Sequence, residues 1–300
     1  MTAPFVQPAK DSVCATDPCP VPPYRRAAGR DDRPSEDRIL ATPSGDSFVV
    51  LDGVSTLSDD QPRGGWYADT LDKLIVDRLA AGSGVELTEV LHDAISVITR
   101  EYALTPGASP AATVSVVRLG DTVVEAAVLG DSPVVVIGHG GTVRTLTDTR
   151  LAELVATRPQ AAEYRRRLAT GSGFDIRHHQ LLVELRDAQT GWINRPGGYW
   201  VVEAVPEAGR QAVTATWSRA ELAQILTATD GVSSAVDDYG LYSWTELAAS
   251  CRTDGPQALV DAVHRAEEHD ADGRAWPRYK PSDDKALAHL DLAPGGTPVG

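Results

Sequence analysis

The sequence predicts a mixed fold of the α/β (α+β) type, in which helices pack on an antiparallel sheet. Two consecutive segments, 67–81 and 87–102, place apolar residues at the spacing of amphipathic helices. From residue 111 the pattern changes to short apolar runs separated by turn residues, which predicts an antiparallel meander over 112–146. Because each helix has one apolar face, the two helices are expected to form a layer on a sheet.

The stretch FVVLDGV at 48–54 is the clearest strand in the chain. Four apolar residues lead into Asp52 and Gly53, which predicts a strand that is buried on both faces and ends at a carboxylate. Residues 35–40 are expected to form its hairpin partner. The same design recurs in ILTATDG, which ends at Asp230 and Gly231, and in VVEAAVLGD, which ends at Asp131.

Several carboxylates at strand ends favour a metal site over isolated turns. An Asp followed by Gly is on its own typical of a turn. Carboxylates that gather in one place need a counter-charge, and oxygen donors without Cys or His favour magnesium, manganese or calcium over zinc.

Composition limits the other classes of function. The 300 residues carry a net charge of −14 with a pI near 4.9, which argues against a nucleic-acid surface and against an anionic membrane surface. Three cysteines are too few for a disulfide framework, and Cys14 with Cys19 lacks a second pair for zinc. Without an apolar signal core or a run of membrane-spanning length, a cytoplasmic protein is expected.

The rest of the chain divides into an arm, one main domain and a short tail. Residues 1–34 are expected to be a loosely ordered arm, 35–292 the domain, and 293–300 a disordered tail. Residues 150–168 are helical in pattern, whereas about 170–216 is expected to be an irregular insertion over the sheet, with a strand at 199–202. Helices are expected after a capping box at 243–246 and from Pro256, and a final strand over 286–292.

Six short motifs, in order, resemble the metal-dependent serine/threonine protein phosphatases of the 2C-like, or PPM, type, as a divergent member of bacterial type. The resemblance covers about residues 33–292. The motifs are SEDR at 35–38, VLDG at 50–53, AATV at 111–114, LGDS at 129–132, TATDG at 227–231 and DDKAL at 283–287.

This resemblance implies a four-layer α-β-β-α sandwich and a phosphomonoester hydrolase that acts on phosphoserine or phosphothreonine. It implies two Mn²⁺ or Mg²⁺ ions, a third, weaker ion, and a water that attacks phosphorus directly. The implied catalytic and bridging carboxylate is Asp52. The further implied metal-site residues are Asp37, Asp230 and Asp284, the carbonyl of Gly53, Asp131 for the third ion, and Glu36 through a water.

The chain also departs from the family pattern. The Arg expected five residues before the first metal Asp is Asp32, so Arg33 is predicted to hold the substrate phosphate, with Arg30 as the alternative. Lys285 replaces the Asn after the last ligand, and 54–57 replaces a Gly-rich segment. These changes keep two alternatives open: a weak or inactive phosphatase-like binding module, and a phosphatase for a small phosphomonoester. The sequence predicts no oligomeric state.

Overall fold

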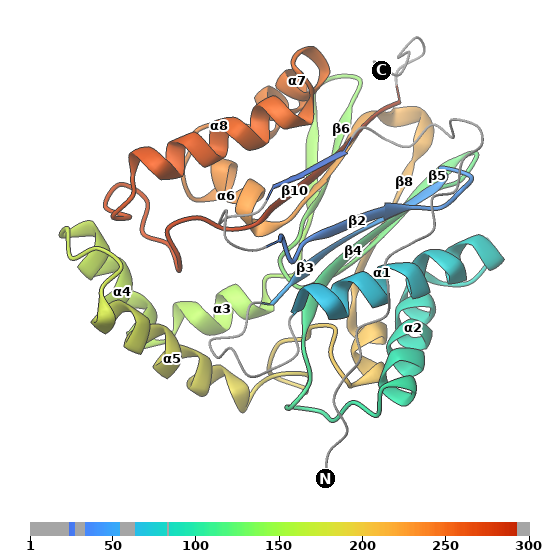
Figure 1. Ribbon diagram of the computed structural model, residues 1–300. Coiled ribbons are helices and arrows are strands. Elements are labelled where there is room, and N and C mark those ends of the chain that lie inside the picture. The colour runs from blue at the N-terminus through green and yellow to red at the C-terminus, as the bar shows by residue number, and fades with distance from the viewer. Residues whose placement is uncertain (1–23, 28–33, 55–63, 83, 293–300) are drawn as a thin grey trace.

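The structure is a computed structural model that describes residues 24–27, 34–54, 64–82 and 84–292. Two five-stranded sheets, antiparallel at every pairing of neighbouring strands, lie at its centre (Figure 1). The first sheet has the order β1 (Tyr24–Ala27), β10 (Lys285–Asp291), β9 (Leu222–Ala228), β6 (Val134–Gly138) and β7 (Val143–Leu146). The second has the order β2 (Arg38–Ala41), β3 (Ser47–Gly53), β4 (Ala112–Leu119), β5 (Val123–Leu129) and β8 (Val213–Ser218).

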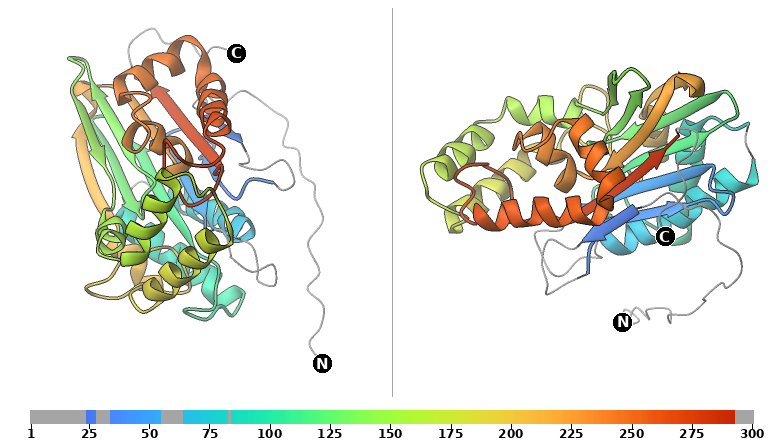
Figure 2. Two further views of the ribbon diagram at one scale, coloured as in Figure 1. Left: turned by 90° about the vertical axis from the view of Figure 1, so that its left-hand side faces the viewer. Right: turned by 90° about the horizontal axis from the view of Figure 1, so that it is seen from above.

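Helices cover the outer face of each sheet. On the second sheet lie α1 (Gly64–Ala81) and α2 (Leu87–Glu101), and on the first lie α6 (Asp230–Asp237), α7 (Trp244–Thr253) and α8 (Gly255–His269). A third group gathers beyond one end of the strands (Figures 1 and 2). It comprises α3 (Arg150–Ala156), α4 (Pro159–Ala169) and α5 (Ile176–Thr190) around their own apolar cluster, and two 3₁₀ helices, η1 (Pro206–Gln211) and η2 (Arg219–Glu221), lie beside β8 in the chain.

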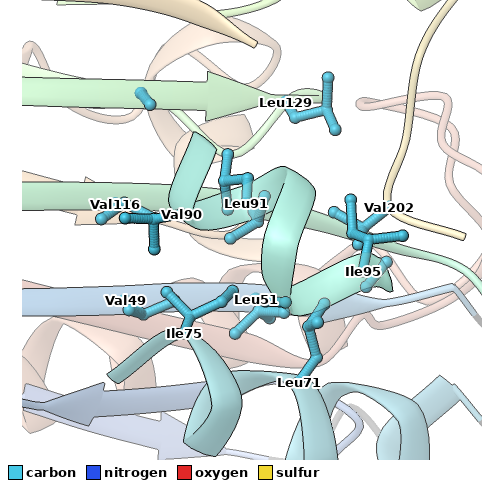
Figure 3. Packing of buried hydrophobic residues seen from close by; sticks show 14 of the residues in the cluster. Val49, Leu51, Leu71, Ile75, Val90, Leu91, Ile95, Val116, Leu129 and Val202 are labelled. Atoms are coloured by element: carbon cyan, nitrogen blue, oxygen red, sulfur yellow. The ribbon is translucent and has the colours of Figure 1, made fainter. Parts of the chain in front are cut away.

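The alternation of side chains along β3 explains the layers. Phe48 and Val50 belong to the cluster between the two sheets, whereas Val49 and Leu51 belong to the cluster under α1 and α2. Figure 3 shows the side chain of Ile75 from α1 lying on this helix-facing side of the strand. A strand that is apolar on both faces therefore places β3 in the middle of the sandwich. The predicted fold class, with two antiparallel sheets flanked by helices, is confirmed.

Three parts of the chain differ from the expectation. Residues 24–27 of the expected arm form β1, which pairs with β10, and the segment expected to be irregular contains α5. Residues 199–202 form isolated bridges instead of a strand. The strand β8 was not expected, because it has only three apolar residues, Val213, Ala215 and Trp217, which alternate with polar ones and pack on the cluster between the sheets, and because it lies at the edge of its sheet among the described strands.

Other expectations fall outside the described residues. These are Cys14 and Cys19, Asp32, the candidate arginines Arg30 and Arg33, residues 55–57 and the tail 293–300. Among the described helices, none has the length and apolar character that a bilayer crossing requires.

Candidate metal centre and active site

The ends of four strands bring the predicted carboxylates to one edge of the sandwich. Because Arg38 pairs with Leu51, the preceding Asp37 lies opposite Asp52 in the second sheet. In the first sheet, Leu287 pairs with Ala228. This register places the chain before β10 beside the end of β9, so Asp283 and Asp284 approach Asp230 from the first sheet.

Two hydrogen bonds join the sheets at this edge. Thr229 Oγ1 donates to Asp37 Oδ2 at 2.7 Å, and the Glu36 N–H donates to Asp284 Oδ2 at 2.6 Å. Thr229 is itself fixed, since its Oγ1 accepts from the Ala286 N–H at 2.9 Å. Sequence reasoning did not identify Thr229, and its position directly before Asp230 was the available signal.

Glycine lets the backbones approach each other closely here. A Cβ on Gly231 would lie 1.9 Å from the Asp284 carbonyl oxygen, and one on Gly53 would lie 2.7 Å from the carbonyl carbon of Gly64 in α1. The glycines that follow Asp52 and Asp230 therefore allow another segment of the chain to pack closely against each of these strand ends.

Burial and mutual repulsion disfavour the charged form of the carboxylates in this cluster. Burial raises the pKa of Asp37 to about 8, against the opposing hydrogen bond from Thr229. Burial, followed by repulsion from neighbouring carboxylates, also raises the pKa of Asp52 and Asp230 well above the usual range. Each of these shifts means that a cation placed among the side chains would be stabilising.

Asp131 lies at the edge of this cluster. Burial raises its pKa, and the negative charges of Asp148 and Asp283 add to the effect. The buried Asp148 is held by Arg150, whose Nε lies 2.7 Å from its Oδ1 and whose Nη2 lies 2.5 Å from its Oδ2. Asp131 thus connects the carboxylates at the strand ends with the start of α3.

In the last motif, DDKAL at 283–287, the structure supports both aspartates as candidate ligands. Asp283, rather than Asp284 alone, interacts electrostatically with Asp37, Asp52 and Asp230, whereas Asp284 receives the Glu36 N–H and interacts with Asp37. Asp284 was the sequence-based choice because it precedes the Asn position of the family motif. The residue pattern alone had left Asp283 or Asp284 open as the carboxylate before the last strand, and these contacts support Asp283 as a candidate ligand beside Asp284.

Two further predicted residues can be placed. The Oε1 atom of the buried Glu36 accepts a long hydrogen bond of 3.5 Å from the Gly65 N–H, at the start of α1. Lys285, which would weaken cation binding if its ammonium faced the metals, points away from them. Its Nζ is buried against Glu267 Oε2 at 2.6 Å.

The donor chemistry of the cluster fits a hard divalent cation. All its side-chain donors are carboxylate oxygens, which Mn²⁺ and Mg²⁺ accept. Within the part of the chain that the structure describes, no three His, Cys, Asp or Glu side chains already converge as a ready-made ligand set.

A hollow of about 500 Å³ lies away from the strand-end aspartates. It is lined by Arg150 and Glu153 of α3, by Pro196 and by Trp200. None of the candidate metal-site carboxylates lines it.

Comparisons with known proteins agree with the architecture. The family model described as protein phosphatase 2C matches residues 26–264. A comparison with curated protein sequences gave no match. Among solved structures, the serine/threonine phosphatase Stp1 from Staphylococcus aureus superposes with a TM-score of 0.53 at 14% identity, covering 91% of this chain and 94% of that one.

Two other bacterial structures are similar in the same degree. The serine/threonine phosphatase PstP/Ppp from Mycobacterium tuberculosis has a TM-score of 0.52 at 14% identity, with coverage of 90% of this chain and 97% of that one. PppA from Pseudomonas aeruginosa has a TM-score of 0.51 at 18% identity, with coverage of 90% and 99%. A further similar structure is the catalytic domain of PstP in complex with two manganese ions, with a TM-score of 0.51 at 13% identity and coverage of 89% and 96%.

Proposed function

The chain belongs to the protein phosphatase 2C family, and on that premise we propose that it is a metal-dependent phosphatase acting on phosphoserine or phosphothreonine in proteins. The observation that carries the proposal is the group of carboxylates that both sheets bring to one edge, where burial and mutual repulsion raise the pKa values of Asp37, Asp52 and Asp230. Such a group is stabilised by divalent cations.

The residues that would hold two Mn²⁺ or Mg²⁺ ions come from each side of the sandwich. From the second sheet, Asp52 and, on the neighbouring strand, Asp37 would hold the ions; from the first sheet, Asp230 with Asp283 or Asp284 would hold them. When bound, the ions would neutralise phosphoryl oxygens and activate a water molecule. The remaining assigned residues are the Gly53 carbonyl, Asp131 for a third ion, and Glu36 acting through a water.

The chain's own hydrogen bonds fix part of this arrangement. Thr229 orients Asp37 by donating a hydrogen bond to its Oδ2. The bond from the Glu36 N–H to Asp284 keeps the second sheet against the segment before β10. These contacts would hold the two halves of the ligand set at a constant separation.

Substrate phosphate needs a donor beyond the metal ions, and Arg33 is the proposed donor. A guanidinium can contact two phosphate oxygens at once. Arg33→Ala should raise KM for a phosphorylated peptide and leave Mn²⁺ affinity unchanged. The same effect from Arg30→Ala alone would instead assign the contact to Arg30.

A weakly active or inactive binding module is the second candidate function. It is favoured by the cationic Lys280, which lies among the same carboxylates. In this case the chain would bind a phosphorylated partner without efficient hydrolysis.

The deciding experiment is hydrolysis of p-nitrophenyl phosphate with Mn²⁺ or Mg²⁺, compared with the same protein after chelation. We expect ion-dependent turnover that Asp52→Asn abolishes and that the exposed control Asp77→Asn retains. A phosphothreonine peptide, assayed beside small phosphomonoesters, separates a protein phosphatase from a metabolite phosphatase. Peptide binding without turnover would support the binding module, and ion-independent turnover would contradict the assigned site.

A further inference from the structure

The side chain of Lys280 enters the acidic cluster from the segment between α8 and β10. Its Nζ lies 2.5 Å from Asp283 Oδ1, and its side chain is 36% exposed. The same ammonium interacts favourably with the negative charges of Asp52, Asp230 and Asp37. These three are the aspartates assigned above to the metal ions.

The backbone on either side of Lys280 is firmly held. Arg278 donates from Nε and Nη2 to the Pro281 carbonyl at 3.0 and 2.9 Å, closing a tight loop around Lys280. Its Nη1 also contacts Asp270 Oδ2 at 2.7 Å, an ion pair in which both side chains are at most 10% exposed. The position of Lys280 is therefore fixed by Arg278, which ties the loop to the end of α8.

Tyr279, the residue before Lys280, is held by contacts with α4 and α5. The Tyr279 carbonyl lies 2.8 Å from His178 Nε2 of α5, and the Tyr279 ring packs on Tyr164 of α4, with centroids 5.3 Å apart. An exposed ion pair between residues three positions apart usually contributes little to stability. Lys280 differs from such a pair because its loop is anchored on both sides and faces four carboxylates.

The partner of Lys280 is also held in place. The Asp283 carbonyl accepts from Lys285 Nζ at 2.8 Å, and Asp283 Oδ1 accepts from the Asp284 N–H at 2.7 Å. The carboxylate that binds Lys280 thus has a fixed backbone, and its Oδ1 already receives two donors. An entering metal ion would meet an oxygen that is shared with an ammonium.

We propose that Lys280 is the resident counter-cation of the acidic cluster and that a divalent metal ion binds there in competition with it. The inference rests on the proposed function, since it takes the cluster to be the metal centre. In the ion-free protein the ammonium offsets part of the carboxylate charge. When an ion binds, the two positive charges repel each other, so the lysine must move or metal affinity falls.

The test is a calorimetric Mn²⁺ titration of the full chain after chelator treatment, with wild type, Lys280→Gln and Lys280→Arg. We expect Lys280→Gln to tighten Mn²⁺ binding by about ten-fold, the order of effect for one partly solvated charge, and Lys280→Arg to stay near wild type. The matched control is Lys73→Gln, because Lys73 forms an exposed pair with Asp69 on α1. Equal Mn²⁺ affinity in wild type and Lys280→Gln would overturn the inference.

Thermal unfolding in chelator provides a second, independent readout. Lys280→Gln should lower Tm without metal and lose this difference at saturating Mn²⁺, whereas Lys73→Gln should show neither effect. If no variant, including wild type, binds Mn²⁺, the proposed function fails, and the Tm in chelator still decides the role of Lys280. If the Tm of Lys280→Gln in chelator then equals that of wild type, Lys280 is not a counter-cation of the cluster. If the Tm falls in Lys280→Gln and not in Lys73→Gln, that role is supported.

Discussion

Lys285 Nζ lies 2.6 Å from Glu267 Oε2, and the two side chains are 0% and 1% exposed. The ammonium also donates to Ser282 Oγ at 3.2 Å and to the Asp283 carbonyl at 2.8 Å, so all three of its protons have acceptors. Glu267 Oε1 in turn accepts from the Tyr239 hydroxyl at 3.1 Å. This buried pair connects α8 to the segment that carries the last carboxylates of the candidate site.

Removing one partner of that pair should be strongly destabilising. Lys285→Met leaves Glu267 buried without its counter-charge, and we expect a loss of about 3–5 kcal/mol in the free energy of unfolding. Urea denaturation measures the loss, with the exposed Lys73→Met as control. The double variant Lys285→Met with Glu267→Leu should recover much of it. A loss below about 1 kcal/mol in the single variant would contradict the pair's role.

The layers of this fold were predictable because burial on both faces leaves a simple mark in the sequence. Segment 48–51 is apolar without alternation, and that pattern is typical of a strand with packing on each side. The strand β8 lacks such an unbroken apolar run, since Val213, Ala215 and Trp217 alternate with polar residues and only this face packs on the cluster between the sheets, while β5 is its neighbour in the sheet. Pairing partners of this kind are set by the tertiary fold and not by local sequence.

The candidate site was predictable to the level of strand ends and no further. A carboxylate after an apolar run indicates which end of a strand it occupies, which was sufficient for Asp52 and Asp230. The choice between Asp283 and Asp284 depends on which way each side chain points from an irregular segment. That direction is set by tertiary contacts such as the hydrogen bond from the Glu36 N–H to Asp284 Oδ2, and by the ion pair between Lys280 Nζ and Asp283 Oδ1.

The two adjacent aspartates should therefore respond differently to substitution. We expect Asp283→Asn to weaken Mn²⁺ binding more than Asp284→Asn, because Asp283 interacts with Asp37, Asp52 and Asp230. Asp284→Asn should mainly lower Tm, since it weakens a charge-assisted bond of 2.6 Å from the Glu36 N–H. Calorimetric titration with Mn²⁺ ranks the pair. The reverse ranking would favour the sequence-based assignment of Asp284.

Gly231 should not tolerate even one methyl group. A Cβ at this position would lie 1.9 Å from the Asp284 carbonyl oxygen, so Gly231→Ala must displace α6 or the segment before β10. We expect a loss of about 2–4 kcal/mol in stability, the range of severe steric and strain effects, with weaker Mn²⁺ binding. Gly140→Ala is the control, because a Cβ there meets no atom within 4 Å. Equal melting temperatures in the two variants would contradict the close approach.

Because of Asp72 in α1, the free energy of unfolding should decrease as the pH rises. Its side chain is 4% exposed, its Oδ1 has no hydrogen-bond partner among the described residues, and burial raises its pKa from 3.8 to about 7. The folded state therefore keeps this proton after the unfolded state has lost it. Between about pH 4 and pH 7 the folded form binds more protons, so its stability decreases with increasing pH, by up to about 4 kcal/mol from this group.

Asp72→Asn should remove that slope, because an amide does not ionise over this range. We expect the variant to be no more stable than wild type near pH 4, where both side chains are uncharged, and more stable at pH 8, where wild type carries a buried charge. Urea denaturation at several pH values between 4 and 8 gives the difference, and Asp77→Asn on the exposed face of α1 is the matched control. A difference between Asp72→Asn and wild type that stays constant over this range would show that Asp72 ionises in the folded protein as it does in the unfolded chain.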